Sequence, residues 1–121
     1  MPGKDGSGLQ AHWIKPALVI AMSEIDISLI VPVFNEEETL GPFIEAVENT
    51  LASEAFSYEY IFINDGSTDN TFNLLKNFNK KNQRIKIINL SRNFGKELAL
   101  TAGIEHALGN AAIPIDCDLQ D

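Results

Sequence analysis

From Ile27 onward, short apolar runs of strand length alternate with longer segments whose apolar residues recur at helical spacing. The first run, ISLIVPVF, is continuous, as expected of a strand covered on both faces. The predicted strands cover Ile27–Phe34, Tyr58–Asn64, Arg84–Leu90 and Ala111–Asp116. Alternation of strand and helix with short connections requires crossovers, and therefore predicts an α/β domain with a mostly parallel, Rossmann-like sheet.

Three helices are predicted between these strands. In the first, apolar residues recur at helical spacing and Pro42 suits the first turn; they are Leu40, Phe43, Ile44, Val47 and Leu51. The second covers Thr68–Asn79, with Phe72, Leu75 and Phe78 on one side. The third covers Lys96–Leu108, with Leu100, Ile104 and Ala107 facing inward. Pro114 is awkward in the last strand, which is therefore irregular or turns this residue away from a partner.

Composition narrows the classes of function. The chain has 121 residues, 45% of them hydrophobic, and a formal net charge of -8, which disfavours binding to nucleic acid and provides no polybasic membrane anchor. One cysteine excludes an internal disulfide and a multi-cysteine zinc site, and a reducing, cytoplasmic compartment is the simpler interpretation. No apolar run reaches the roughly 20 residues of a membrane helix.

Residues 1–21 differ from the remainder of the chain. Their first eight positions are rich in turn-forming residues, and no sustained periodicity follows. We interpret them as a disordered extension or leader, with the domain covering residues 22–121. The alternative is an amphipathic docking segment around Trp13 and Ile14.

Polar residues follow the first two predicted strands, where ligands bind on parallel sheets. Asn35 could cap the next helix in a capping box with Glu38, which leaves Glu36 available for a ligand. After the second strand, Ser67 or Asp69 could cap a helix. Asp65 lies at the strand end, placed to accept a hydrogen bond from a ring N–H of a bound base.

The ends of the last two strands carry charge. Arg92 and Lys96 follow the third strand, where a helix start favours anions, although a solvated turn is the alternative. Asp116 and Asp118 flank Cys117 after the fourth strand. Mutually repelling carboxylates at this spacing suit Mg²⁺ or Mn²⁺, shared with the phosphate oxygens of a substrate.

Together and in this order, the four strand-end segments resemble glycosyltransferase family 2, whose members have the GT-A nucleotide-diphosphosugar transferase fold. The similarity covers roughly residues 26–121 and is greatest to the branch that makes polyprenyl-phosphate sugars, such as bactoprenol glucosyltransferases and dolichol-phosphate mannose synthases. It is carried above all by the SRNFGKE segment from Ser91 and the DCDLQD segment from Asp116. Asn64 departs from the Asp-Asp pair that is more usual in the family.

The resemblance also implies roles for individual residues. Those that match the nucleoside pocket are Pro32, Phe34, Glu36, Ile63 and Asp65. Asp116 and Asp118 match the Asp-x-Asp pair at the ribose, diphosphate and metal, and Gln120 matches a further metal ligand. We add Arg92, Lys96 and Cys117 to the expected substrate-binding residues.

The implied activity is inverting transfer of a sugar from a nucleoside-diphosphate sugar, most simply a UDP-sugar, to a polyprenyl phosphate. The full-length enzyme is expected at the cytoplasmic face of the membrane, with homo-oligomerisation left open. The chain corresponds to the N-terminal, donor-binding half, so we expect little or no turnover from it alone. The alternative is a non-catalytic nucleotide-binding or interaction fragment.

Two other classes fit less well. A dinucleotide oxidoreductase needs a Gly-x-Gly-x-x-Gly turn after the first strand, where this chain has Phe34-Asn35-Glu36. A phosphoacceptor receiver domain needs a lysine after its acidic residues. Here Lys96 comes before Asp116 and Asp118, so the order is wrong.

Overall fold

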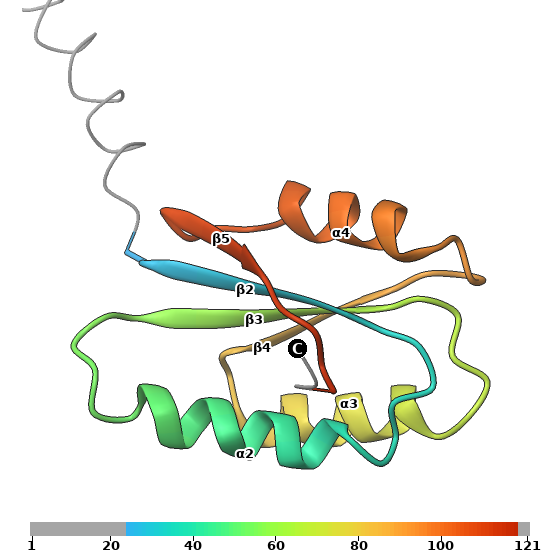
Figure 1. Ribbon diagram of the computed structural model, residues 1–121, viewed down its shortest axis with the longest axis horizontal. Coiled ribbons are helices and arrows are strands. Elements are labelled where there is room, and N and C mark those ends of the chain that lie inside the picture. Colours follow the sequence, from blue (N-terminus) through green and yellow to red (C-terminus); the bar gives the residue numbers. More distant parts are fainter. Residues whose placement is uncertain (1–23, 119–121) are drawn as a thin grey trace, which may run out of the picture.

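The computed structural model describes residues 24–118, in which strands and helices alternate as the sequence predicts (Figure 1). The expected leader over residues 1–21 lies outside this part. The elements in chain order are β2 (Ile27–Val33), α2 (Leu40–Leu51), β3 (Tyr58–Asn64), α3 (Thr71–Lys81), β4 (Ile85–Asn89), α4 (Lys96–Glu105) and β5 (Ala111–Pro114). None of the helices in residues 24–118 combines the length and the apolar character needed to cross a bilayer.

The strands form one parallel sheet in the order β4-β3-β2-β5, which confirms the predicted sheet type. From β2 the chain moves outward to β3 and β4, and then crosses back over the sheet to β5 on the other side of β2. Consequently α2 and α3 cover one face of the sheet and α4 covers the other (Figure 1).

The two central strands are buried on both faces, as their continuous apolar runs predict. Alternate residues of β2 and β3 pack against α2 and α3, including Val31 and Phe62. The residues between them, Ile30, Ile61 and Ile63, pack beneath α4 with Ala99. Side chains alternate between the faces of a strand, so one apolar run supplies both halves of the core.

The predicted inward face of the third helix is wrong at Ile104, which is 51% exposed. Instead, Ala99 and Gly103 are the buried residues of α4. A Cβ at Gly103 would lie 2.6 Å from side-chain atoms of both Ile30 and Ile63. The small residues therefore allow α4 to lie directly on the sheet, and the larger Ile104 turns away. The helix also ends at Glu105, earlier than predicted.

Pro114 fits because β5 is an edge strand of the described sheet. The Ala111 N–H donates to the carbonyl of Asp26, just before β2, and the Ile115 N–H donates to the carbonyl of Ile30 in β2. Amides alternate in direction along a strand, so the nitrogen of Pro114 points away from β2. Of the two alternatives for Pro114, the second is therefore the one that the structure has: the position faces away from its partner. All four residues of β5 are exposed, including Ile113 at 42%.

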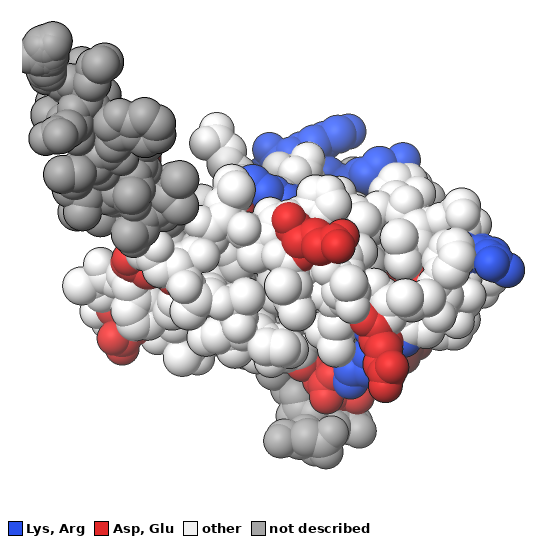
Figure 2. Space-filling model, turned by 90° about the horizontal axis from the view of Figure 1, so that it is seen from above, with Lys and Arg blue, Asp and Glu red and all other residues white. Residues whose placement is uncertain are grey.

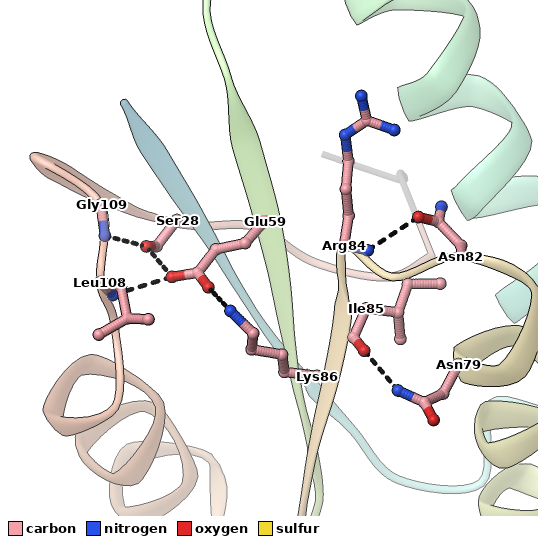
Figure 3. Close-up of polar contacts among 9 residues, drawn as sticks. All are labelled: Ser28, Glu59, Asn79, Asn82, Arg84, Ile85, Lys86, Leu108 and Gly109. Carbon is pink, nitrogen blue, oxygen red and sulfur yellow. Dashed lines mark hydrogen bonds and ion pairs between the residues drawn. The ribbon is translucent and has the colours of Figure 1, made fainter. Parts of the chain in front are cut away.

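A buried carboxylate ties the strands together at the end of the sheet away from their carboxyl termini (Figure 3). Glu59, only 1% exposed, accepts hydrogen bonds from Ser28 Oγ at 2.6 Å and from the Leu108 backbone N–H at 2.8 Å. Lys86 Nζ lies 2.6 Å from its other oxygen. Glu59 thereby links β2, β3, β4 and the α4–β5 connection.

Burial alone would raise the pKa of Glu59, but the hydrogen bonds from Lys86, Ser28 and Leu108 outweigh it and hold the pKa below its usual 4.5. The ionised form is therefore the one that stabilises the fold. Its contribution is fully present above pH 4.5 and is lost as the pH falls through the lower, folded-state pKa.

We expect Glu59→Gln to reduce the free energy of unfolding at pH 7 by about 2 kcal/mol, because Lys86 loses its counter-charge and an acceptor becomes a donor. Denaturant unfolding at several pH values measures the effect. The gap between wild type and variant should narrow as the pH falls below 4.5. Glu54→Gln, at an exposed position, is the control and should unfold like wild type at every pH.

Candidate functional site

The crossing of the chain over β2 creates a crevice at the carboxyl ends of β2 and β5. The helix after β2 and the helix before β5 lie on opposite faces, so the loops separate there, which is where open α/β sheets bind ligands. A cavity of about 320 Å³ lies at this point. It is lined by Pro32, Val33, Phe34, Glu36, Asp65, Lys96, Asp116, Cys117 and Asp118. The sequence predicted all of these as site residues except Val33.

Asn35 joins the two loops that follow β2 and β3. Its backbone is left-handed, with φ 53°, and its side-chain oxygen accepts the N–H groups of Thr68 at 2.8 Å and Asp69 at 3.3 Å. The predicted capping box with Glu38 is therefore wrong, because the Asn35 side chain serves the neighbouring loop. Of the two predicted caps, Ser67 and Asp69, only Asp69 contacts the start of α3: it precedes the N-cap residue Asn70, and its carboxylate accepts the N–H of Thr71.

Glu36 is oriented by two threonines that sequence reasoning missed. Thr39 Oγ1 donates to Glu36 Oε1 at 2.7 Å, and the Glu36 N–H donates to Thr71 Oγ1 at 2.9 Å. Thr39 Oγ1 also lies 3.7 Å from Cys117 Sγ. Thr39 thus connects the loop after β2 with the acidic turn after β5. In the sequence, the one signal for this role of Thr39 is its position three residues after Glu36 in a turn.

Asp65 is buried, with 4% of its surface exposed, and both carboxylate oxygens accept backbone hydrogen bonds. The Phe94 N–H donates at 2.7 Å and the Gly95 N–H at 3.0 Å. Next to it, Gly66 has φ 74°, and a Cβ there would lie 2.3 Å from the backbone nitrogen of Asn93. Asp65 and Gly66 therefore fix the loop between β4 and α4 against the end of β3.

The acidic turn after β5 is held by its central residue. Cys117 is 3% exposed and packs in the core formed with α2, while Asp116 and Asp118 line the cavity on either side. Burial raises the pKa of the Cys117 thiol to about 11. The thiol is therefore protonated at neutral pH, and its structural role is to seat the two aspartates.

Lys96 faces this turn from the first residue of α4. Its Nζ lies 2.6 Å from Asp116 Oδ1. A lysine at a helix start opposes the helix macrodipole, and the contact with Asp116 compensates for this.

Two predicted site residues within the described part of the chain do not line the cavity. Ile63 is fully buried beneath α4, because its position in β3 faces that helix. Arg92 lines a neighbouring depression that shares Phe34 with the cavity, and its guanidinium lies 4.6 Å from the ring centroid of Phe94. Gln120 lies outside the described residues.

The cavity carries an excess of negative charge. Four carboxylates line it, and Lys96 supplies the one ammonium group among its lining residues. Glu36 and Asp65 belong to residues 24–69, which contain no Lys or Arg, and Lys96 ends residues 70–96, which contain no Asp or Glu. Figure 2 shows most of the visible Lys and Arg side chains along one border of the molecule, largely apart from the acidic ones.

The oxygen ligands of the cavity are of the kind that Mg²⁺ and Mn²⁺ prefer. Within residues 24–118, no three His, Cys, Asp or Glu side chains are already close enough to hold a metal ion. A metal at Asp116 and Asp118 would therefore need oxygen ligands from a substrate or water. The protonated Cys117 between them would not compete, since only the thiolate binds metal well.

We expect the thiol of Cys117 to react with a disulfide reagent at pH 8 at least about ten-fold more slowly in the native chain than in concentrated guanidinium chloride. Burial blocks access, and the thiolate forms only as the pH rises toward about 11. The absorbance of released thiol measures the rate, and the single cysteine makes the end point one equivalent. Equal rates with and without denaturant would show that the turn is not seated in the core.

Comparison with known proteins identifies the class. Residues 28–121 match the family described as Glycosyl transferase family 2. An uncharacterised glycosyltransferase of Synechocystis sp. is 50% identical over 97 residues, which cover 80% of this chain and 30% of the relative. A prophage bactoprenol glucosyl transferase homolog of Escherichia coli is 46% identical over 95 residues, which cover 78% of this chain and 31% of the relative.

The fold agrees with solved structures. The crystal structure of Staphylococcus aureus TarS 1–349 in complex with UDP superposes with a TM-score of 0.64 at 26% identity, over 78% of this chain and 28% of that chain. The sheet order and the flanking helices thus agree with the N-terminal part of the GT-A fold. The chain belongs to glycosyl transferase family 2. It spans about 30% of the length of the curated relatives given above.

Proposed function

We propose that this chain forms the donor-binding part of an enzyme that transfers a sugar from a nucleoside-diphosphate sugar. The observation that carries the proposal is the charge of the cavity, where four carboxylates face one lysine at the switch point of the sheet. A diphosphate would be repelled there unless a cation entered with it. The family match supports sugar transfer as the reaction.

We infer that Asp116 and Asp118 would hold Mg²⁺ or Mn²⁺, with Gln120 as a further ligand. Both aspartates line the cavity, and hard oxygen ligands suit these ions. When bound, such an ion would stabilise the negative charge of the departing nucleoside diphosphate. The chain's own contribution is to hold the two carboxylates apart and in place through the buried Cys117.

The nucleoside is proposed to occupy the other wall of the cavity, against Pro32, Phe34, Glu36 and Asp65. Phe34 is 45% exposed and offers a ring for stacking. Each carboxylate oxygen of Asp65 accepts a backbone N–H, and a carboxylate oxygen can accept a second donor such as a base N–H. The UDP complex of TarS supports a UDP-sugar as the donor.

We propose a polyprenyl phosphate as the acceptor, and the name of the bactoprenol glucosyl transferase homolog supports this choice. A phosphate acceptor is already an anionic nucleophile, so direct displacement with inversion would need no general base. With a membrane lipid as acceptor, we propose that the full-length enzyme acts at the cytoplasmic face of the membrane. The chain spans about 30% of the length of these relatives, and we propose that their further residues are needed for turnover.

Calorimetry of the full-length protein with UDP, with and without Mn²⁺, tests the proposal. We expect UDP binding to require the metal, and Asp118→Asn to weaken it at least ten-fold, about 1.4 kcal/mol. Glu54→Gln removes a carboxylate far from the cavity and should bind UDP like wild type. Metal-independent UDP binding that Asp118→Asn leaves unchanged would refute the proposal.

A further inference from the structure

Lys96 is the one residue from the basic segment, residues 70–96, that reaches the cavity. It begins α4, on one side of the crevice, and it contacts Asp116, which follows β5 on the other side. In the absence of ligands, its ammonium group is therefore the positive charge that offsets the surrounding carboxylates.

The contact between Lys96 and Asp116 is short but exchangeable. Nζ and Oδ1 are 2.6 Å apart, yet 61% of the Lys96 side chain and 40% of the Asp116 side chain are exposed. Ion pairs with this much contact with water contribute little to stability. The carboxylate can therefore change partners without disturbing the core, because the turn itself is seated by Cys117.

A divalent cation at Asp116 would compete with Lys96 directly. Both are positive and both require the same carboxylate, and two like charges at one site repel each other. Metal binding without a nucleotide must therefore displace Lys96 into water or tolerate the repulsion. A diphosphate changes this balance, since its oxygens offer the displaced ammonium a new partner.

We propose that Lys96 is a positioning residue that couples metal binding to nucleotide binding. It weakens metal binding while it occupies Asp116, and it moves to the phosphate oxygens of the nucleotide when nucleotide and metal bind together. This inference rests on the proposed function, because it assigns an order to the binding of ligands at the same site. Metal alone binds weakly, and metal with nucleotide binds tightly.

The coupling predicts effects of opposite sign from one substitution. In the full-length protein, Lys96→Met should bind Mn²⁺ alone about five-fold more tightly than wild type, since a competing charge is gone. The same variant should bind UDP in the presence of saturating Mn²⁺ about ten-fold more weakly, since a charge-assisted contact is lost. The electron paramagnetic resonance signal of free Mn²⁺ measures the first affinity, and calorimetry with UDP measures the second.

Two further variants act as controls. Lys80→Met makes the same change in net charge at an exposed position near the end of α3, and should leave both affinities at their wild-type values. Lys96→Arg keeps the charge and should retain weak binding of Mn²⁺ alone. A structural role for Lys96 would lower both affinities together, and would not raise the one for Mn²⁺.

The coupling is refuted if Lys96→Met binds Mn²⁺ alone no more tightly than Lys80→Met. This can occur while wild type still binds UDP with Mn²⁺, so the proposed function would stand without it. Conversely, tighter Mn²⁺ binding by Lys96→Met in a protein that binds no UDP would preserve the competition at Asp116 and refute the proposed donor.

Discussion

The burial of β2 on both faces and along both edges is the constraint on which the rest of this structure depends. β2 pairs with β3 on one side and with β5 on the other, while α2 and α4 cover opposite faces. A strand in this position must be apolar at nearly every residue, because no side of it meets water. The strands that follow β2 are added first on one side of it, as β3 and β4, and then on the other side, as β5. The crevice at the carboxyl end of β2 results from this change of side.

Most residues of the site come from loops or from the ends of strands and helices, and polar contacts fix their positions. Polar side chains bridge loops that are far apart in the sequence. Asn35 accepts backbone N–H groups from the loop after β3, and Asp65 accepts them from the loop after β4. Thr39 then reaches both Glu36 and the turn that carries Cys117. Each strand end thus holds the next loop, so the rigidity of the sheet extends to the cavity.

The sequence predicted the sheet well because a doubly covered strand leaves a strong local signal. The predicted bounds of β3 agree with the structure at both ends, and β2 differs by one residue. Prediction failed where the outcome depended on a contact across the fold. Ile104 and Leu100 are equally apolar, and only the close approach of Gly103 to Ile30 and Ile63 decides which side of α4 faces the sheet.

The same distinction applies to the site. Residue type and position after a strand were sufficient to place Glu36, Asp65, Lys96, Asp116 and Asp118 around one cavity. They were insufficient for Ile63, whose direction depends on the alternation of side chains along β3, and for the threonines that orient Glu36. The capping box at Asn35 was consistent with the local sequence, but the side-chain oxygen of Asn35 instead accepts two backbone N–H groups from another loop.

The charge of the cavity also follows from chain order. β2, β3 and their loops belong to a stretch without a single cation, and α3, β4 and the loop to α4 belong to a stretch without a single carboxylate. The parallel topology brings the carboxyl ends of all these strands to one edge of the sheet, so acidic and basic loops meet there.

The order of the strands then determines which basic side chains reach the cavity. β4 lies at the far edge from β5, which leaves Arg92 outside the cavity and brings Lys96 into it by way of α4. The parallel topology thus brings Glu36 and Asp65 from the acidic stretch, Lys96 from the basic stretch and the two aspartates that follow β5 to one crevice. Such a crevice favours an anionic ligand only when that ligand arrives with a cation of its own.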